Sequence, residues 1–410
     1  MNSAEPQRIY LDNAATSFPK PDSVVAAVTQ YMTQCGVAAG RGTSRQATEL
    51  DARIAACRAG LARLLGAASP HAISFAFNGT DSLNLAIHGC LAPGDHVVTT
   101  ELEHNSALRP LRDWETHRGV QVTHLAPDVD GRIDPASVRD ALRPNTRLVA
   151  VTHASNVTGV IQPIREIGEL IAQSRTLTPG PFLGGRGEPA TRGVLYLVDA
   201  AQTAGHVPID VQAAHIDLLC CSGHKGLLGP LGTGVTYIRS SRASEIRPLR
   251  HGGTGSQSES LDQPTGSPDK YESGNPNAVG LVGLAAAVEW IEAHGVPALQ
   301  ARTQPLLALL YEGLSANPRV RVLSPDPRKV DNAGVISFVI DMMDPRITAS
   351  IMDSHFGIEI RSGLHCAPLV HRSLGTADTG GTARASIGPF TTEADVDALC
   401  TAVLMITAAM

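Results

Sequence analysis

Between residues 73 and 240, short runs of apolar residues alternate with amphipathic stretches of helical periodicity. This alternation is typical of βαβ units, in which parallel strands are joined by crossover helices. We expect strands at 73–77, 96–100, 121–125, 148–152, 195–198, 218–221 and 234–238. The pattern therefore predicts an α/β protein whose large domain is built on a mostly parallel, seven-stranded sheet.

The pattern changes beyond Gly280. There we expect two long helices, a strand, a further helix and a last helix, at 281–294, 297–317, 335–340, 347–356 and from residue 393. This order indicates a smaller α+β domain, which the N-terminal tail completes. We assign residues 20–275 to the large domain, and residues 1–19 and 276–410 to the small one.

Two long segments rich in glycine interrupt the alternation. Residues 176–192 separate a helix from the next strand, and we expect them to form a surface insertion. Residues 251–276 form a second loop, rich in Gly, Ser and Asn. Loops of this length inside a compact domain are often functional, and we expect this one to reach a partner subunit.

Two of the predicted strands lead to a charged residue. One apolar run ends at Asp199, and another is followed by Ser222-Gly-His-Lys225. A lysine and an aspartate at neighbouring strand ends are what pyridoxal phosphate (PLP) requires. The lysine amine forms a Schiff base with the cofactor aldehyde, and the carboxylate keeps the pyridine nitrogen protonated. A lysine after a strand is a weak signal alone, but Gln202 and His224 strengthen it.

A phosphate site is expected where the first predicted strand meets the next helix, at Asn78-Gly79-Thr80-Asp81. Backbone N–H groups at a helix start attract phosphate, Gly79 allows close approach, and Thr80 offers a hydroxyl. Ser222 and His224 offer a second grip. Taken alone, the segment also suits an ordinary turn with a capping residue.

His104 and Asn156 each follow a predicted strand. The imidazole of His104 is placed to stack on the pyridine ring and relay protons, and the amide of Asn156 to donate to the ring hydroxyl. A lone histidine on a loop is more often simply solvated. Ligands of open α/β sheets bind at the carboxyl ends of the strands, so the convergence of these residues is the specific observation.

A second group of residues lies in Arg361-Ser-Gly-Leu-His365-Cys366-Ala-Pro368. The neighbouring Arg361 and His365 favour the thiolate form of Cys366, which is the nucleophile. The alternative is a buried structural cysteine. Arg384, early in a predicted strand, suits a substrate carboxylate, which it would bind in a bidentate manner, although a surface salt bridge is the simpler interpretation.

Composition excludes other classes of site. The net charge of −6 argues against nucleic acid or an anionic membrane as the main partner. The seven cysteines form no CxxC pair and have no zinc-ligand spacing, so neither a disulfide framework nor a metal is expected. Without a signal-like apolar segment near the start, the default is a cytoplasmic protein with reduced thiols.

These motifs resemble the class V aminotransferase superfamily, fold type I of the PLP enzymes. Within it, the chain is most similar to the group II (Suf-type) cysteine desulfurases. The resemblance covers nearly the whole chain and runs through Ile9-Tyr-Leu-Asp-Asn-Ala-Ala-Thr16, Asn78-Gly-Thr-Asp, Glu103-His104, Ser155-Asn156, Val198-Asp199-Ala-Ala-Gln202, Ser222-Gly-His-Lys225, 361–366 and Arg384.

The resemblance implies a role for each of these residues. Lys225 carries PLP, His104 stacks on its ring, and Cys366 accepts sulfur. By the same resemblance, Asp199 and Gln202 contact the ring, and Asn156 contacts the ring hydroxyl. The phosphate is bound by Gly79, Thr80, Ser222 and His224. The substrate is bound by Asn156, Arg361 and Arg384. The expected partners are L-cysteine, a second subunit and a sulfur-acceptor protein.

The chain departs from the family pattern at Asn275, where the family usually has a threonine that reaches the partner subunit's cofactor phosphate. By the resemblance, Asn275 is a cofactor-binding residue, because its amide can still donate a hydrogen bond to that phosphate. The insertion at 176–192 is a second departure. The rival reactions on the same cofactor are selenocysteine lysis, amino-group transfer and racemisation. A non-catalytic scaffold is the remaining alternative, which the set of Lys225, Asp199 and His104 disfavours.

Overall fold

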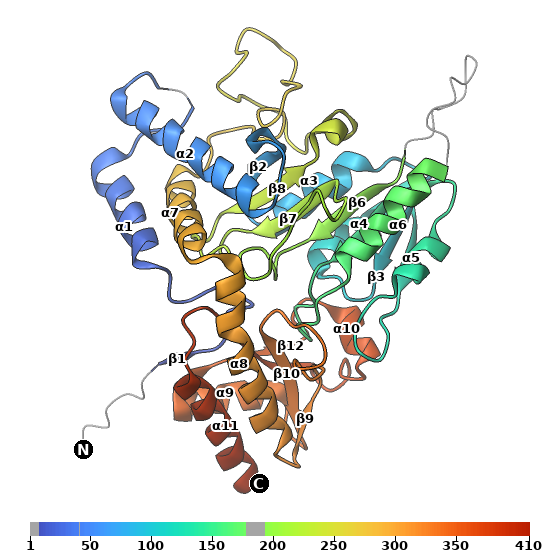
Figure 1. Ribbon diagram of the computed structural model, residues 1–410, viewed down its shortest axis with the longest axis vertical. Helices are drawn as coiled ribbons and strands as arrows, with labels where there is room; N and C mark the ends of the chain where they lie inside the picture. The colour runs from blue at the N-terminus through green and yellow to red at the C-terminus, as the bar shows by residue number, and fades with distance from the viewer. Residues whose placement is uncertain (1–7, 41, 178–192) are drawn as a thin grey trace.

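The computed structural model describes residues 8–40, 42–177 and 193–410. Figure 1 shows a larger part around one sheet and a smaller part around another, with helix α8 (Val296–Ser315) running between them. The first described strand, β1 (Ile9–Tyr10), and the last helix, α11 (Glu393–Ala408), both lie in the smaller part. The N-terminal strand thus lies with the C-terminal elements.

The larger sheet has seven strands in the order β2-β8-β7-β6-β5-β3-β4. Its strands are β2 (Ile73–Ala76), β3 (His96–Thr100), β4 (Gln121–Leu125), β5 (Thr146–Thr152), β6 (Leu195–Asp199), β7 (Leu218–Ser222) and β8 (Gly234–Ile238). All neighbours are parallel except β8, which is antiparallel to β7 and β2. No helix crosses between β7 and β8, so the chain direction reverses there. The predicted mostly parallel seven-stranded sheet is confirmed.

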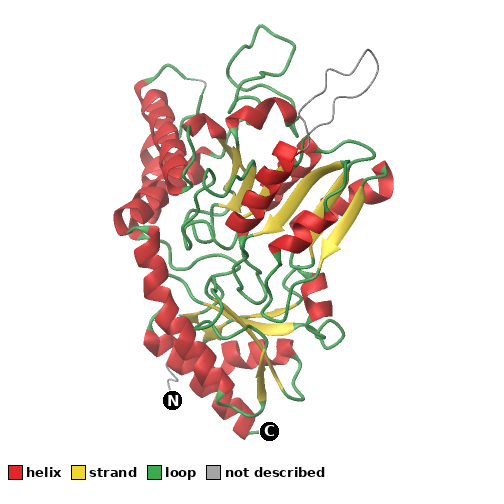
Figure 2. Cartoon of the chain, turned by 45° about the vertical axis from the view of Figure 1, so that its right-hand side comes forward, coloured by secondary structure: helices red, strands yellow, loops and turns green. Residues whose placement is uncertain are grey.

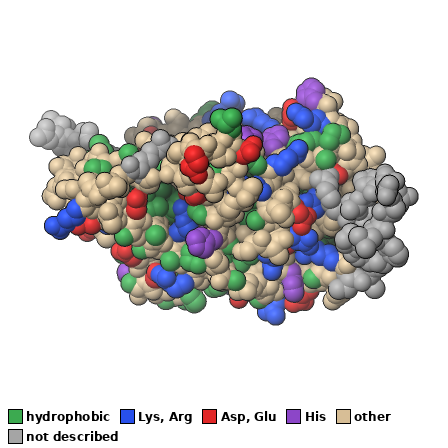
Figure 3. All heavy atoms as spheres, turned by 90° about the horizontal axis from the view of Figure 1, so that it is seen from above, with side chains coloured by type: hydrophobic (Ala, Val, Ile, Leu, Met, Phe, Trp, Pro, Cys, Tyr) green, Lys and Arg blue, Asp and Glu red, His purple; other side chains and the backbone are tan. Residues whose placement is uncertain are grey.

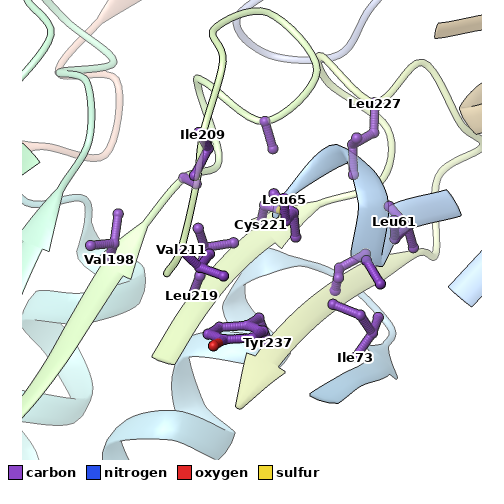
Figure 4. Packing of buried hydrophobic residues seen from close by; sticks show 14 of the residues in the cluster. Leu61, Leu65, Ile73, Val198, Ile209, Val211, Leu219, Cys221, Leu227 and Tyr237 are labelled. Atoms are coloured by element: carbon purple, nitrogen blue, oxygen red, sulfur yellow. The ribbon is translucent and has the colours of Figure 1, made fainter. Parts of the chain in front are cut away.

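Strand residues alternate between two hydrophobic clusters, one on each face of this sheet. Val149, Val198 and Leu219 belong to one cluster, whereas Leu148 and Leu197 belong to the other. A parallel sheet covered on both faces needs this continuous apolar run. Figure 4 shows part of the first cluster, with Leu61 and Leu65 from helix α2 and its end lying over strands β7 and β8.

The helices cover the two faces unequally, and Figure 2 shows the helices flanking the sheet. One face carries α3 (Gly79–Cys90) and α4 (Asn105–Arg118). The opposite cluster includes residues of α1 (Asp22–Gln30), α2 (Arg45–Leu64), α5 (Pro135–Ala141), α6 (Ile164–Leu177) and α7 (Ala278–His294). Short helical turns are formed by η1 (Tyr31–Cys35), η2 (Pro70–Ala72) and η3 (Ser240–Glu245).

The second sheet has four strands in the order β12-β13-β10-β9. They are β9 (Val320–Val322), β10 (Val335–Ile340), β12 (Arg361–Gly363) and β13 (Thr382–Ser386), packed with α9 (Pro345–Phe356) and α11 (Glu393–Ala408). The short helix α10 (Pro368–Ser373) instead contributes Val370 to a cluster of the large sheet. The N-terminal strand β1 (Ile9–Tyr10) pairs with β11 (Ile358–Glu359). The predicted α+β character of this part is therefore seen in the structure.

The hydrophobic clusters change within α8. Helix α7 packs against α1 and α2 beside the large sheet, and Leu299 of α8 belongs to that cluster. From Leu307 onward, the buried residues of α8 join the cluster of the small sheet. The domain division at residue 275 stays a prediction, and the packing change lies further along the chain than that boundary.

The two predicted loops differ in what the structure describes. Most of the insertion at 176–192 lies outside the described residues. The loop at 251–276 projects from the top of the molecule in Figure 1. Figure 3, viewed from that side, shows acidic and basic side chains interspersed.

In the described part of the chain, no single helix has the length and apolar character to cross a bilayer; only α7 and α8 taken together do, with a bend of 79° between them.

Asp217 anchors the edge of the large sheet opposite the strand ends that bear polar residues. Its side chain is fully buried, pairs with Arg175, and lies 3.4 Å from Nε of Arg239 and 3.6 Å from Nε of Arg242. It also accepts a hydrogen bond of 2.9 Å from the backbone N–H of Tyr196. One carboxylate thus neutralises part of a three-arginine cluster where β6 and β7 begin.

We predict that Asp217→Asn lowers the free energy of unfolding by about 3 kcal/mol, because it leaves partly buried guanidinium groups without the counter-charge of a fully buried carboxylate. Urea denaturation measures this change. Asp140→Asn is the matched control, because Asp140 pairs with Arg139 at the exposed surface, and it should leave the unfolding midpoint unchanged. Equal midpoints for both variants would contradict the account.

Candidate active site

Polar residues from five strand ends of the large sheet meet around one cavity of about 140 Å³. It is lined by Asn78, Gly79, Thr80, Leu83, His104, Ser106, Thr152, Ala154, Asn156, Asp199, Ala201, Gln202, Ser222, His224 and Lys225. Nine of the residues singled out from the sequence are therefore neighbours in space. Asn275, Arg361, Cys366 and Arg384 are not part of this lining.

Lys225 lies in the turn that follows β7. Burial lowers the pKa of its amine to about 8, and the carboxylate of Asp199 partly opposes this shift. Arg384 and Arg361 lower the pKa further. A pKa near 8 leaves a useful fraction of the amine uncharged near neutral pH, which is the form that attacks an aldehyde.

Asp199 ends β6, directly beside Thr152 of β5. One carboxylate oxygen accepts a hydrogen bond of 2.9 Å from the backbone N–H of Ala201. Burial raises the pKa of Asp199, while the Ala201 N–H and Lys225 oppose the rise. Among the described residues, no cationic side chain forms an ion pair with it. A protonated pyridine nitrogen would supply the missing counter-charge, so this position fits PLP.

His104 caps the N-terminus of α4. Its Nδ1 accepts a hydrogen bond of 3.0 Å from the backbone N–H of Ser106, so the ring proton resides on Nε2. Burial, together with the charge of Lys225, lowers the pKa of His104 to about 4. The ring is therefore neutral at physiological pH and is held at a fixed angle, as a stacking residue requires.

The sequence motifs did not indicate a role for Ser106, although this residue lines the cavity. Its hydroxyl lies 2.8 Å from Nδ1 of His104 and 2.7 Å from the hydroxyl of Thr80. It thus connects the expected stacking residue to the expected phosphate site. Its position two residues after His104, at a helix start, was the signal that could have revealed it.

The start of α3 is the place where the sequence predicts phosphate binding. Asn78 caps this helix by accepting a hydrogen bond from the N–H of Asp81 at 2.9 Å, as in the alternative interpretation. The cap and the cradle coexist, however, because a Cβ on Gly79 would lie only 2.7 Å from the hydroxyl of Ser222. The buried Nδ1 of His224 has no hydrogen-bond partner. A phosphate between these groups would use the space and the free nitrogen.

The N-terminal segment contacts two residues that line the cavity. The amide of Gln202 donates to the carbonyl of Ala14 at 3.1 Å. The carbonyl of His224 accepts from the ammonium of Lys20 at 2.8 Å and from the hydroxyl of Thr16 at 3.0 Å. The backbone just before Lys225 is thereby held by residues more than two hundred positions earlier in the chain.

Arg384 is buried, with an exposure of 2%. Its guanidinium donates to Oδ1 of Asp12 at 2.8 Å and to the carbonyl of Asn156 at 2.9 Å, while its Nε has no partner. The alternative of a surface salt bridge is therefore wrong, because the pair with Asp12 lies inside the protein. Arg361 is about half exposed and approaches the same aspartate at 3.8 Å.

Cys366 lies in the short turn between β12 and α10. Both His365 and Cys366 have left-handed backbone conformations, with φ of 48° and 57°. Such conformations cost about 1 kcal/mol or more for residues other than glycine and are typical of functional turns. The thiol side chain is exposed, whereas Cys57 and Cys90 are buried on their helices. Burial raises the pKa of Cys57 to about 12.

The expected role of His365 as a positive neighbour of the thiol needs correction. The ring is buried, and its Nε2 lies 2.9 Å from the hydroxyl of Thr382. Burial, aided by the charge of Arg384, lowers the pKa of His365 to about 2. The ring is therefore neutral at physiological pH, and Arg361 is the cationic residue of this motif.

Asn275 lies apart from the cavity. It lines a separate hollow of about 30 Å³, together with Phe77, Arg250 and Gly274. The structure thus does not bring Asn275 to the phosphate cradle of its own subunit. Its expected contact with a partner subunit stays a prediction.

Comparison with known proteins agrees with this geometry. The family model of the class-V aminotransferases matches residues 9–178 and 188–399. A probable cysteine desulfurase of Methanothermobacter thermautotrophicus is 34% identical, with 95% of this chain and 92% of that protein covered. A cysteine desulfurase of Yersinia pestis is 31% identical over 95% of this chain and 91% of its own length.

Solved structures give the same result. The apo structure of a cysteine desulfurase from Thermococcus onnurineus has a TM-score of 0.87 and 32% sequence identity, over 98% of this chain and 96% of that one. A cysteine desulfurase from Escherichia coli has a TM-score of 0.84 and 29% identity, over 98% and 95%. This chain belongs to the class-V aminotransferase family of PLP-dependent enzymes.

Proposed function

We propose that this protein is a PLP-dependent cysteine desulfurase that converts L-cysteine to L-alanine and retains the sulfur atom on Cys366. The observation that carries the proposal is the exposed thiol of Cys366 in a left-handed turn next to a cavity suited to PLP. An aminotransferase or a racemase has no use for such a thiol. The cysteine desulfurases among the relatives support the same assignment.

In this proposal, different residues of the cavity bind the cofactor and transfer the proton. Lys225 holds the cofactor through its amine, Asp199 faces its ring nitrogen, and Ser222 with the start of α3 binds its phosphate. When bound, PLP withdraws electrons from the substrate Cα and so weakens its bonds. A neutral Lys225 amine accepts the Cα proton, and the neutral ring of His104 covers the cofactor.

Arg384 binds the substrate carboxylate in this proposal. Its guanidinium is already directed by Asp12 and by the carbonyl of Asn156, and its Nε remains free. A carboxylate pairing with Arg384 loosens the contact with Asp12, because both anions compete for one guanidinium. Arg361, half exposed beside the same aspartate, adds positive charge at the entrance.

The sulfur step balances without an external reductant. The thiolate of Cys366 attacks the substrate sulfur, a new S–S bond forms, and the bond between Cβ and sulfur breaks. The carbon side gains the electron pair and a proton and leaves as alanine. The enzyme keeps a persulfide on Cys366, in which the substrate sulfur has been oxidised.

The finer assignment is to the group II (Suf-type) enzymes. Only residues 364–367 connect β12 to α10, so Cys366 lies in a short connection rather than in a long loop. A thiol held in this way needs an acceptor protein that approaches it. We propose that the acceptor carries sulfur toward iron–sulfur cluster assembly. Cytoplasmic location suits the seven cysteines, all of which lie within the described residues and none of which is in a disulfide bond.

We also propose that the active unit is a homodimer. The loop at 251–276 projects from the molecule, and its end at Asn275 lines a hollow that does not belong to its own cavity. Phe77, with 43% exposure, lies in the same hollow. An exposed apolar residue beside a projecting loop favours contact with a second subunit.

The first prediction concerns Lys225. The rate at which apoprotein takes up PLP should rise with pH, reach half of its maximum near pH 8 and level off above that pH, because the pKa of the amine is about 8 and only its neutral form reacts. Stopped-flow absorbance measures the rate, and borohydride followed by mass spectrometry should place the adduct on the peptide containing Lys225. A rate that still rises near pH 10, where an unperturbed lysine titrates, would be inconsistent with this account.

The second prediction concerns the thiol. Cys366→Ala should abolish sulfide release from L-cysteine, since the only nucleophile for the sulfur is removed, while the yellow colour of the bound cofactor remains. Selenocysteine lysis should be affected less, because selenium leaves more readily. Cys57→Ala is the matched control. Full L-cysteine activity in Cys366→Ala would disprove the proposal.

The third prediction concerns assembly. Light scattering under assay conditions should give twice the mass of the chain, and Asn275→Ala should weaken PLP retention during dialysis without changing the oligomeric state. A fully active monomer would exclude the dimer proposal. Unchanged PLP retention would exclude a role for Asn275 alone.

A further inference from the structure

The turn that presents Cys366 adopts a conformation that its own residues disfavour. His365 and Cys366 are consecutive non-glycine residues in left-handed conformations. L-residues rarely adopt this conformation once, and two in succession persist only where surrounding contacts impose them. Those contacts must therefore determine where the thiol lies.

Two backbone contacts hold the turn to the large sheet. The carbonyl of His365 accepts a hydrogen bond of 2.6 Å from the side-chain amide of Asn156. The carbonyl of Cys366 accepts one of 2.7 Å from the N–H of Asn105, the residue after His104. The main chain at the thiol is thus fastened to two strand ends that line the cavity.

The third contact is a buried chain of side-chain hydrogen bonds. Nε2 of His365 lies 2.9 Å from the hydroxyl of Thr382, which donates to Ser337 at 3.3 Å. Ser337 in turn donates to the carbonyl of Val157 at 2.6 Å. Because the hydroxyl of Thr382 donates onward, it accepts from the imidazole N–H. His365, Thr382 and Ser337 are 6% exposed or less, so water cannot replace a missing partner.

Strand β13 connects this chain to the substrate-binding residue. Gly363 of β12 lies opposite Thr382, and Arg361 lies opposite Arg384. Residues two apart on a strand face the same side, so Thr382 and Arg384 project from one face of β13. Thr382 holds the ring of His365, and Arg384 donates to Asn156, whose amide holds the carbonyl of His365. Strand β13 therefore carries both Arg384 and the residue that holds the Cys366 turn.

We propose that Thr382 is a positioning residue: through its hydrogen bond to His365, it holds the Cys366 turn at a set place relative to Arg384. The substrate carboxylate at Arg384 and the attacking sulfur are then kept at a separation that suits an amino acid with sulfur on Cβ. This inference rests on the proposed desulfurase function. Thr382 itself touches neither the cofactor cavity nor the thiol.

The test compares Thr382→Val with Thr382→Ser in the PLP-loaded enzyme. Valine keeps the shape of threonine but leaves the imidazole N–H without an acceptor, whereas serine restores the hydroxyl. With L-cysteine, kcat should fall at least about tenfold in Thr382→Val, because a displaced nucleophile reacts slowly. KM and the cofactor absorbance should stay near wild type, and Thr382→Ser should recover most of the rate.

Selenocysteine lysis separates positioning from general damage. Thr382→Val should spare it, and the change should have no further effect on it in a Cys366→Ala background, where no nucleophile remains to be positioned. Thr407→Val serves as a control, because it also removes a buried threonine hydroxyl. This hydroxyl lies on α11 and accepts a hydrogen bond of 2.8 Å from the side-chain amide of Asn317. This control should leave both activities unchanged.

A second variant tests the same bond from its other side. His365→Phe keeps a ring in the buried site but removes the N–H, and it should reproduce the selective loss of L-cysteine activity. Combined with Thr382→Val, it should cost no more than His365→Phe alone, since both remove one interaction.

Several outcomes would overturn the inference. They are wild-type kcat in Thr382→Val, equal loss of both activities, failure of serine to restore the rate, or failure of both Thr382→Val and His365→Phe to fold. If Cys366→Ala lacks L-cysteine activity while Thr382→Val keeps it, only the positioning role fails. If Cys366→Ala keeps full activity, the proposed function fails as well.

Discussion

The parallel pairing of β3, β5, β6 and β7 is the constraint on which the site depends. Parallel strands end at the same edge of a sheet, so residues that are far apart in sequence leave the strands side by side. Thr152 lies in register with Asp199, and Asp199 with Cys220, only five residues before Lys225. A one-residue slip would turn Asp199 toward the opposite hydrophobic cluster.

Burial then gives these groups their chemistry. The same desolvation raises the pKa of Asp199 and lowers that of Lys225 and His104. Each shift brings the group closer to its neutral form, so charges are costly in the cavity unless they are paired. A cofactor with a protonated ring nitrogen and a phosphate supplies those pairs. The site therefore fits PLP through its electrostatics as well as through its shape.

The sequence predicted the parts of the structure that depend on local pattern. Apolar runs located every strand of the large sheet, and the polar residues just beyond them located Lys225 and Asp199. Local sequence pattern could not predict the contacts between segments that are distant in the chain. The contacts of Ser106 with Thr80 and of Asp12 with Arg384 join separate segments of the chain, and the neutrality of His365 depends on its burial beside Thr382. The change of clusters within α8 was likewise hidden, because a helix continuous in sequence passes from one core to the other.

The central claim is that sulfur leaves the substrate for one particular cysteine. Mass spectrometry of the PLP-loaded protein, quenched after a single turnover with L-cysteine in the absence of reductant, tests it most directly. The peptide containing Cys366 should gain the mass of one sulfur atom, with one alanine formed for each modified site, and treatment with a thiol should reverse the gain. Alanine formation with an unmodified Cys366, or with the added sulfur on another cysteine, would contradict the account.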